Sequence, residues 1–361
     1  MNKIAIVIGT RPEIVKMAPV IHECMKRKLN YLLVHSGQHY DYEMDKVVFE
    51  RFHLPDPHYN LKVGSGRHGQ VTGAIMHGLE EVLIANDVDG VLVHGDTTTT
   101  AAGALVAAKL NIAIGHVEAG LRSYDRTMPE EINRKVADHI STHLFAPTEE
   151  AVRHLAEEGL RNGVYFVGQT AADALRYLRP ELMRSEIFQR LGIADGERYI
   201  FLTAHRQENT DDRERFEQIV DGLDRVAKAT GHRFVCPLHP RTESKLQTYG
   251  MTERFYRIPG MTVIPPVDPI ESLALQSRAA LVLTDSGGLQ EEACMLDVPC
   301  VTIRENTERP ETVLVGANKL AGYSAQGILD AVMSMLEVER GWEQPYGDGH
   351  ASERIIDLFV G

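Results

Sequence analysis

Short apolar runs rich in β-branched residues alternate with longer stretches of helical period along the chain. Runs such as 3–8, 90–94 and 112–117 have the length and composition of buried parallel strands. The stretches between them, such as 98–110, repeat apolar residues every three or four positions, and Pro129 stands where a helix is expected to begin. This alternation predicts an α/β fold in which helices cover parallel sheets.

The same alternation begins again after residue 167, with strand-like runs at 198–203 and 280–284. The predicted fold class is therefore two Rossmann-like, doubly wound domains that face each other across a cleft. In such sheets ligands bind at the carboxyl ends of the strands, so the loops after the strands are the places to search for a site. We expect an N-terminal Rossmann-like domain, a C-terminal Rossmann-like domain and a last helix that packs back on the first domain, over residues 1–167, 168–345 and 346–361 respectively.

The composition is that of a soluble globular protein, with 43% hydrophobic and 25% charged residues among 361. The apolar runs are far shorter than a membrane span and the first residues lead directly into a strand, so we expect no membrane partner, no signal peptide and a cytoplasmic location. The four cysteines lack C-x-x-C spacing, which favours reduced core residues over disulfides or a zinc site. A net charge of −13 argues against nucleic acid as a partner, and an anionic ligand would need a local positive site.

The loop after the first strand reads Gly9-Thr10-Arg11-Pro12-Glu13, and Lys16 follows one helical turn later. It matches neither G-x-G-x-x-G nor the P-loop pattern, so a nicotinamide dinucleotide is disfavoured and a P-loop is excluded. Arg11 and Lys16 at a helix N-terminus are suited to an anion. Taken alone, a plain strand-to-helix turn with solvated cations is the better interpretation.

Carboxylates follow two other predicted strands of the first half. Asp96 and Glu118 each stand just past an apolar strand, and Glu130 opens the next helix. If the two strands are neighbours, Asp96 and Glu118 emerge side by side, and a shared, partly dry site makes one of them a base near neutral pH. A helix N-cap is a competing role for Asp96. Together with His94 and His116 they also form a conceivable metal-ligand set, a minority interpretation because no H-x-H or H-x-x-x-H signature supports it.

In the second half the candidate residues again follow strands. His205 and Arg206 end one strand, where the histidine is suited to neutralising a phosphate or protonating a leaving group. Ser286-Gly287-Gly288 then leads from another strand into a helix and presents bare backbone amides to a diphosphate. Glu292 lies one turn inside that helix, where an acidic side chain accepts bonds from ribose hydroxyls. Arg309 follows the next strand and adds a cation.

These segments together resemble the non-hydrolysing UDP-N-acetylglucosamine 2-epimerases, which have the GT-B fold. The resemblance extends nearly from end to end, and so many motifs in the same order are highly specific. The matching segments are GTRPE from Gly9, HGDTTTT from His94, HVEAGLRS from His116, PEEINR from Pro129, LTDSGGLQEEA from Leu283, TERPE from Thr307 and YGDG from Tyr346.

The resemblance implies reversible interconversion of UDP-GlcNAc and UDP-ManNAc, by elimination and re-addition of UDP through a 2-acetamidoglucal, in a homodimer that serves cell-surface polysaccharide biosynthesis. No hydride moves, so neither a cofactor nor a metal is required. It assigns the acid/base carboxylates to Asp96, Glu118 and Glu130, and the group facing the leaving diphosphate to His205. The UDP-sugar would be bound by Arg11, Lys16, Arg206, Ser286, Gly287, Gly288, Glu292 and Arg309.

The chain departs from the family pattern at several positions. Many bacterial members carry an arginine where this chain has Tyr40, after Gln38-His39, and another where it has Gln207; both regions contribute to a regulatory UDP-GlcNAc site in those enzymes. The usual Gly-Asn-Thr at the domain connection is Gly168-Gln169-Thr170, and the usual aromatic near the uracil pocket is replaced around Val267-Asp268-Pro269. Regulation, the hinge and base stacking are therefore left open.

Several rival functions remain. A 2-epimerase of a UDP-2,3-diacetamido-uronic acid is the nearest, but relatives of that specificity tend to lack the Arg309-Pro310 pair. A hydrolysing epimerase is disfavoured because the motifs belong to the non-hydrolysing branch. A GT-B glycosyltransferase does not need three carboxylates in its first domain, and a silent UDP-sugar sensor does not need His205. A metal-dependent hydrolase is the remaining alternative.

Overall fold

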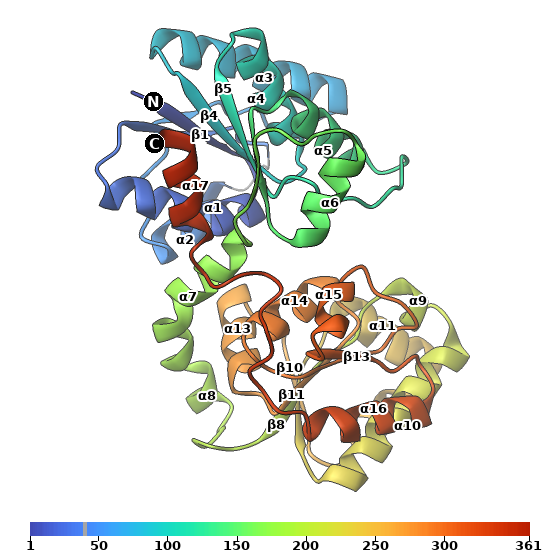
Figure 1. Ribbon diagram of the computed structural model, residues 1–361. Helices are drawn as coiled ribbons and strands as arrows, with labels where there is room; N and C mark the ends of the chain where they lie inside the picture. The colour runs from blue at the N-terminus through green and yellow to red at the C-terminus, as the bar shows by residue number, and fades with distance from the viewer. Residues whose placement is uncertain (39–41) are drawn as a thin grey trace. The chain divides into compact units, whose positions relative to one another are not determined.

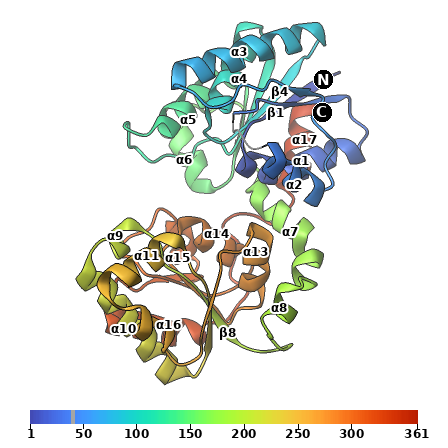
Figure 2. The ribbon, with the colours of Figure 1, turned by 180° about the vertical axis from the view of Figure 1, so that it is seen from behind.

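A computed structural model describes residues 1–38 and 42–361, with residues 42–45 described by their backbone only. The chain divides into two compact units (Figures 1 and 2). Unit 1 comprises Met1–Tyr177 and Tyr346–Gly361, and unit 2 comprises Leu178–Pro345. The first boundary thus falls inside helix α7 (Thr170–Met183), ten residues beyond the expected position at 167.

Unit 1 is built on a parallel sheet that has seven strands in the described part of the chain, in the order β3-β2-β1-β4-β5-β6-β7. This is the strand order of the Rossmann fold. The strands are β1 (Ile4–Ile8), β2 (Tyr31–His35), β3 (Tyr59–Asn60), β4 (Gly90–His94), β5 (Ala113–Val117), β6 (His143–Ala146) and β7 (Val164–Phe166). The helices are α1 (Arg11–Lys26), α2 (Tyr42–Arg51), α3 (His68–Ala85), α4 (Thr98–Lys109), α5 (Pro129–Ile140), α6 (Glu149–Glu157), the start of α7, and α17 (Ala351–Val360).

Alternation of side chains along β1 distributes them between two cores. Ile4, Ile6 and Ile8 pack on one face with α1 and α17, whereas Ala5 and Val7 pack on the other with α3 and α4. Every β1 residue is buried, as expected of a central parallel strand covered by helices on both faces. Figure 1 shows α17 beside α1, so the last helix completes the core of unit 1.

Unit 2 repeats the architecture with a parallel sheet of six strands among the described residues, in the order β10-β9-β8-β11-β12-β13. The strands are β8 (Tyr199–Thr203), β9 (Arg233–Pro237), β10 (Met261–Ile264), β11 (Leu281–Thr284), β12 (Cys300–Thr302) and β13 (Asn318–Leu320). The helices are α8 (Ile187–Arg190), α9 (Gln207–Thr210), α10 (Arg213–Thr230), α11 (Pro240–Tyr249), α12 (Thr252–Tyr256), α13 (Pro269–Arg278), α14 (Gly287–Met295), α15 (Pro310–Leu314) and α16 (Ala325–Leu336).

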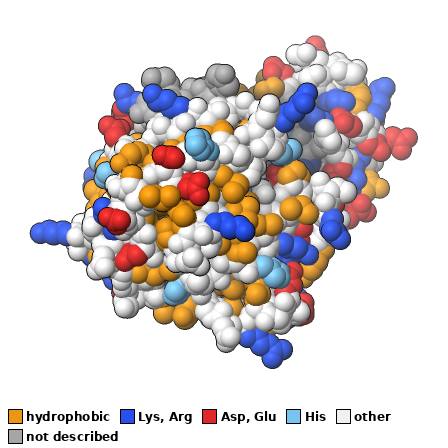
Figure 3. All heavy atoms as spheres, turned by 90° about the horizontal axis from the view of Figure 1, so that it is seen from above, with side chains coloured by type: hydrophobic (Ala, Val, Ile, Leu, Met, Phe, Trp, Pro, Cys, Tyr) orange, Lys and Arg blue, Asp and Glu red, His pale blue; other side chains and the backbone are white. Residues whose placement is uncertain are grey.

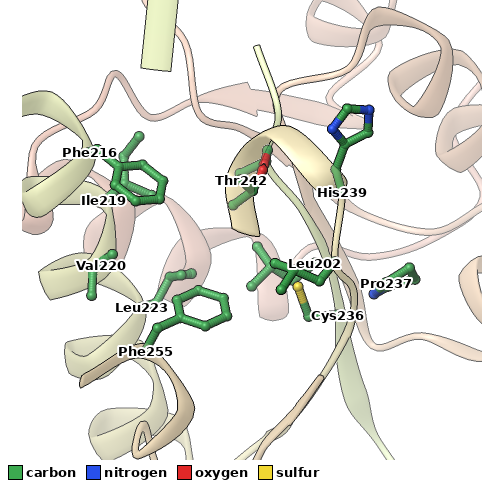
Figure 4. A pocket seen from close by; sticks show the side chains of 12 residues that line it. Leu202, Phe216, Ile219, Val220, Leu223, Cys236, Pro237, His239, Thr242 and Phe255 are labelled. Carbon is green, nitrogen blue, oxygen red and sulfur yellow. The ribbon is translucent and has the colours of Figure 1, made fainter. Parts of the chain in front are cut away.

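The α/β prediction with two doubly wound, Rossmann-like units is confirmed by these two sheets. One face of the unit 2 sheet packs against α10 and α16. Figure 4 shows a small apolar pocket within this core, lined by side chains of β8, β9, α10 and α12, with His239 and Thr242 at its edge. The carboxyl ends of the strands carry the loops that hold the candidate residues.

The surface carries both signs of charge. On the face seen in Figure 3, acidic and basic side chains are interspersed among apolar and neutral ones, so the net negative charge does not gather there into one patch. Among the described residues, no helix is both long and apolar enough to cross a bilayer. The four cysteines are buried free thiols.

Candidate active site

An ion pair joins the start of α1 to the end of β5 in unit 1. Lys16 Nζ lies 2.5 Å from Glu118 Oε1, and Gln169 Nε2 donates a hydrogen bond of 3.1 Å to the same oxygen. His94 Nε2 lies 3.6 Å from the other carboxylate oxygen. Burial by itself raises the pKa of Glu118, but the charges of Lys16 and His94 and the two hydrogen bonds outweigh it and lower this pKa to about 2. Glu118 is therefore ionised at neutral pH.

His94 contributes a buried imidazole to the same site. Its burial lowers its pKa to about 4, against the opposing attraction of Glu118, so the ring is neutral at pH 7. Within the residues that the structure describes, neither ring nitrogen has a hydrogen-bond partner. A buried polar group without a partner is uncommon and calls for a functional explanation.

The backbone at Glu118 is strained. Its φ is +70°, in the left-handed region, which costs a residue with a side chain about 1–2 kcal/mol. Gly95 on the neighbouring strand end also has a positive φ, and a Cβ there would lie 3.4 Å from Glu118 Oε2. The Glu118 carboxylate thus lies against the residue that immediately precedes Asp96.

Asp96 follows β4, which pairs with β5, so the condition set for placing Asp96 near Glu118 is met. The helix N-cap is Thr97, whose Oγ1 accepts from the backbone N–H of Thr100, so the competing N-cap role for Asp96 is wrong. The Asp96 carboxylate is 34% exposed and accepts a hydrogen bond of 2.5 Å from Arg134. Asn133 donates to the Asp96 carbonyl oxygen, at 2.8 Å. Asp96 is thus held at the strand end with its carboxylate open to solvent.

The two glutamates that open α5 have different surroundings. Glu130 is exposed on the first turn, whereas the Glu131 side chain is buried. Glu131 accepts from the backbone N–H and the hydroxyl of Ser123 and from Arg134. Arg134 therefore joins Glu131 to Asp96, and Glu130 is the one left facing solvent.

Glu13 forms a second buried carboxyl site next to these strand ends. Its oxygens accept from the backbone N–H of Gly9 at 3.0 Å and from the Thr97 hydroxyl at 2.7 Å. Burial raises its pKa to about 7, in spite of these hydrogen bonds. Arg11, at the start of the same helix, is exposed. Glu13 thus fixes the loop that carries Arg11 to the loop that carries Asp96.

The metal-ligand alternative included His116, but both nitrogens of its ring have other hydrogen-bond partners. His116 Nδ1 lies 2.7 Å from Asp138 Oδ1, and its Nε2 lies 2.8 Å from the carbonyl oxygen of Gly95. Among the side chains that the structure describes, at residues 1–38 and 46–361, no group of three or more His, Cys, Asp or Glu is arranged to hold a metal ion. The four side chains that the alternative required are therefore not arranged as a ligand set: His94, Asp96, His116 and Glu118.

In unit 2 the buried carboxylate of Asp285 orders the loop after β8. It accepts hydrogen bonds from the backbone N–H groups of His205 and Arg206, each at 2.9 Å to one oxygen, and from the Asn209 side chain. The His205 ring stacks on His239 at 4.9 Å, and its Nδ1 lies 3.6 Å from Asp285. The imidazole is one-third exposed. Asp285 thus presents His205 at a strand end with its ring open to a ligand.

The start of α14 has the features of an anion site. Ser286 is the N-cap in an extended conformation, and Gly287 and Gly288 form the first helical turn without side chains. A Cβ at Gly287 would lie 3.7 Å from a guanidinium nitrogen of Arg206 and 3.8 Å from a Glu308 carboxylate oxygen. Bare amides, a helix N-terminus and one guanidinium therefore converge at a single place.

The remaining candidates of unit 2 lie beyond this turn. Glu292 accepts a hydrogen bond of 2.6 Å from Gln276, and burial raises its pKa to about 7. Arg309 forms an ion pair with Glu291 and is about one-third exposed. Arg304, the other arginine of this region, is buried between Glu208 and Glu308. Arg304 therefore supports the loop, and Arg309 is the more accessible cation.

Sequence reasoning did not assign Glu13, Arg134 or Asp285 to the site, whereas it noted His239 as a strand end similar to that of His205. Glu13 and Asp285 stand inside motifs that it did quote, GTRPE and LTDSGG, and this was the available signal. Arg134 stands in PEEINR, three residues after Glu131, a spacing at which helical side chains meet.

The residues at which the chain departs from the family pattern lie in different structural settings. Gln169 contacts Glu118, so the residue at the domain connection takes part in the site of unit 1. Gln207 begins α9 and is exposed, and Asp268 is the N-cap of α13. His39 and Tyr40 lie outside the described residues.

Fold and site define an α/β protein with two Rossmann-like units, one with acidic side chains at its strand ends and one with a glycine-rich helix start beside a guanidinium group. The chain belongs to the UDP-N-acetylglucosamine 2-epimerase family, whose model matches residues 22–360. This confirms the resemblance that the motifs indicated.

Individual relatives match over their whole length. The UDP-N-acetylglucosamine 2-epimerase of Methanococcus maripaludis is 46% identical, with 100% of this chain and 99% of the relative covered. The UDP-2,3-diacetamido-2,3-dideoxy-D-glucuronate 2-epimerase of Pseudomonas aeruginosa is 38% identical over 99% of both chains.

Solved structures of relatives support the same family and the same fold. The UDP-GlcNAc 2-epimerase of Methanocaldococcus jannaschii is 43% identical and covers 99% of both chains with a TM-score of 0.93. The same enzyme in complex with UDP-GlcNAc and UDP matches at 44% identity, with the same coverage and a TM-score of 0.79. The GT-B fold class that the resemblance implied is confirmed by this likeness.

Proposed function

We propose that this protein is a cofactor-free isomerase that interconverts UDP-GlcNAc and UDP-ManNAc by inverting C2. The observation that carries the proposal is the 46% identity, over the whole chain, to an enzyme that bears the name UDP-N-acetylglucosamine 2-epimerase. The complex of a further relative with UDP-GlcNAc and UDP supports the same class of substrate.

The chemistry would proceed in two balanced halves. A carboxylate takes the proton from C2 while the C1–O bond breaks and UDP leaves, which gives a 2-acetamidoglucal. UDP then re-adds to C1 while a proton reaches the opposite face of C2. Because the proton leaves one face and returns to the other, more than one acid/base group is needed. We assign this exchange to Asp96, Glu118 and Glu130.

Lys16 gives Glu118 a way to change its basicity. While the ion pair persists, Glu118 is a weak base because its pKa is about 2. A diphosphate competes with Glu118 for the Lys16 ammonium group, and loss of that partner in a buried site raises the pKa of the carboxylate. Binding of the substrate would thus raise the pKa of Glu118, and so make it a stronger base, at the moment when the C2 proton is within its reach.

We assign departure of UDP to the groups at the strand ends of unit 2. His205, Arg206 and the amides of Ser286, Gly287 and Gly288 would stabilise the charge that develops on the diphosphate. Glu292 is suited to the ribose hydroxyls, and Arg309 with Arg11 and Lys16 would supply the remaining cations. Unlike a dehydrogenase, this chemistry moves no hydride, which agrees with the lack of a G-x-G-x-x-G loop after β1.

The substrate itself has one serious alternative. The relative from Pseudomonas aeruginosa bears the name of a diacetamido-uronate epimerase. A uronate adds a carboxylate to the sugar and requires a further cation near it. The cations among the candidate residues are all assigned to the diphosphate, which leaves none for a sugar carboxylate. We therefore favour the simple amino sugar.

The test is incubation of the purified protein with UDP-GlcNAc in deuterated water, followed by proton NMR. Appearance of a second UDP-sugar with deuterium at C2 would support the proposal. Free sugar together with UDP would mean hydrolysis instead. Turnover of the UDP-diacetamido-uronate alone, with UDP-GlcNAc untouched, would move the assignment to the alternative substrate.

We further propose that the enzyme is a cytoplasmic homodimer that supplies an activated amino sugar for cell-surface polysaccharides. Four free, buried thiols agree with a reducing compartment. Sedimentation of the purified protein at micromolar concentration tests the assembly, and a monomer would contradict it.

A further inference from the structure

A fully buried carboxylate on α5 contacts three groups of the segment that carries Glu118. Asp138 Oδ1 lies 2.7 Å from His116 Nδ1. Asp138 Oδ2 accepts from the backbone N–H of Gly120 at 3.2 Å and lies 2.7 Å from an Arg122 guanidinium nitrogen. One side chain thus binds the chain two residues before Glu118, two residues after it, and again at residue 122.

The segment between these contacts has an unusual backbone. Glu118 has a φ of +70° and Gly120 a φ of +85°, so two of three consecutive residues are in the left-handed region. A Cβ at Gly120 would lie 2.4 Å from the carbonyl oxygen of Ala151, so this turn is packed closely against α6. A residue with a side chain persists in the left-handed region only when its surroundings enforce it. The contacts of Asp138 on both sides of Glu118 are such surroundings.

The same network reaches the neighbouring strand end. His116 Nε2 lies 2.8 Å from the carbonyl oxygen of Gly95, the residue before Asp96. Asp138 is therefore linked through one imidazole to the loop that holds the second candidate carboxylate. Asp138 itself lies in the last turn of α5, at the end opposite to Glu130.

Asp138 is ionised within the network. Burial raises the pKa of Asp138, but the charge and hydrogen bond of His116, together with those of Arg122, outweigh it and lower this pKa. Arg122 has a buried side chain and also forms a two-bond ion pair with Glu158, at 2.8 and 2.7 Å. Asp138 is therefore a charged group with partners on both oxygens, and its contacts with His116 and Arg122, each at 2.7 Å, are the short ones.

We propose that Asp138 is a positioning residue that holds Glu118 in its left-handed conformation and so aims the Glu118 carboxylate at the reacting carbon. It has no direct part in the chemistry. This inference rests on the proposed function, because it assigns to Asp138 a role in the turnover of Glu118. It adds a residue from outside the motif that contains Glu118.

Two substitutions of Asp138 separate geometry from charge. In Asp138→Asn the amide oxygen still accepts from Gly120 and Arg122, and the amide nitrogen donates to His116, so we expect kcat within about fivefold of the wild type. Asp138→Ala removes all three contacts, and we expect kcat to fall about 30-fold or more, since a displacement of about 1 Å in an active site costs up to roughly 100-fold. The KM for UDP-GlcNAc and the Kd for UDP should stay within about threefold, because the UDP-binding candidates lie elsewhere.

Asp173 offers a matched control. It is also a buried aspartate of unit 1, and it also accepts three hydrogen bonds, from the backbone N–H of Ala351 and from the backbone N–H and hydroxyl of Ser352. Asp173→Ala should lower the melting temperature as Asp138→Ala does while kcat stays within about twofold. The comparison of the two variants thus separates a loss of protein stability from a displacement of the Glu118 carboxylate.

The fold of each variant is checked first, by circular dichroism and by the Kd for UDP. If Asp138→Ala does not fold, His116→Phe takes its place. It removes the Asp138 contact before Glu118 together with the contact to the Gly95 carbonyl, and we expect about a fivefold or greater fall in kcat. Full kcat in a folded Asp138→Ala or His116→Phe, or an equal loss in Asp173→Ala, would overturn the inference. A wild-type enzyme that does not epimerise UDP-GlcNAc would instead overturn the proposed function.

Discussion

The ammonium group of Lys16 and the carboxylate of Glu118 lie 2.5 Å apart, and they join the first helix of unit 1 to the end of its fifth strand. The carboxylate is 7% exposed and the lysine is about one-quarter exposed, so the pair is partly shielded from solvent. A close ion pair of this kind determines the basicity of the acid that it contains.

Replacement of Lys16 by methionine keeps the length of the side chain and removes its charge. Burial then acts on Glu118 with less opposition, so its pKa rises from about 2. Because a carboxylate is ionised only above its pKa, the acid limb of the kcat/KM profile should move to higher pH. We also expect kcat/KM at pH 7 to fall at least about tenfold, since Lys16 is also a candidate for the diphosphate.

Lys109→Met serves as the control for this profile, because Lys109 is an exposed lysine in the last turn of α4. Its pH profile should match the wild type. An unchanged acid limb in Lys16→Met would mean that the ion pair does not control Glu118.

Neutral replacements of the two carboxylates at the strand ends should separate chemistry from binding. Asp96→Asn and Glu118→Gln should each lower kcat by about 100-fold to 10,000-fold, the usual contribution of a general acid or base. The Kd for UDP, measured by calorimetry, should change no more than a few-fold, since neither residue is assigned to the nucleotide. A collapse of UDP binding would show that these residues have been given the wrong role.

Arg309→Ala should act on the nucleotide. Hydrogen bonds to charged groups contribute about 1.5–3 kcal/mol, and exposure of about one-third places Arg309 near the lower figure. We therefore expect the Kd for UDP to rise about tenfold, as calorimetry would measure. An unchanged Kd would remove Arg309 from the UDP site, whereas Arg257→Ala, at an exposed position of unit 2, should leave the Kd as it is.

Glu13 makes the stability of the protein depend on pH. Its pKa is raised from 4.5 to about 7, so between these values the folded state binds a proton that the unfolded state has released. The contribution of Glu13 to the free energy of unfolding is thus largest at low pH and decreases as the pH rises from 4.5 to about 7. At about 1.4 kcal/mol per pH unit, the decrease amounts to ~3 kcal/mol.

Glu13→Gln should remove this dependence. Denaturation by urea at pH 5 and pH 8 would show a smaller difference between the two pH values for the variant than for the wild type. Glu80→Gln, on an exposed position of α3, should keep the wild-type difference. Equal pH dependence in Glu13→Gln and the wild type would show that Glu13 does not titrate in this range.

Treatment with a chelator should leave turnover intact. The proposed chemistry depends on carboxylates, guanidinium groups and backbone amides, and it requires no Lewis acid. Assay in EDTA, with and without added divalent ions, measures this directly. Loss of activity that Mg²⁺ or Zn²⁺ restores would revive the hydrolase alternative.

The central strands were predictable because buried parallel strands have a strong composition signal. Ile4–Ile8 and Gly90–His94 were located within a residue of their observed bounds. The edge strands β3 and β13 were missed, since two or three residues of mixed polarity carry no periodicity. Helix α11 was missed as well, because its sequence PRTESKLQTY is largely polar and only two of its residues are buried.

The site was predictable as far as strand order determines it. Asp96 and Glu118 could be proposed as neighbours on the condition that their strands pair, and β4 and β5 do pair. The contacts of Arg134 and Asp138 could not be foreseen, because they depend on how α5 lies against two loops. The boundary between residues 345 and 346 agrees with the expectation, whereas the first boundary lies ten residues further along because α7 continues across it.

Helix α17 has a consequence for the order in which the chain folds during synthesis. Its residues Ile355, Ile356 and Phe359 belong to the core that contains β1, so this core stays incomplete until these three residues leave the ribosome. Unit 2, which ends at Pro345, is by then already synthesised in full. The domain that is translated second is therefore the first that can finish folding. One apolar face of β1 is covered only in part, by α1, until a helix encoded more than three hundred residues later completes it.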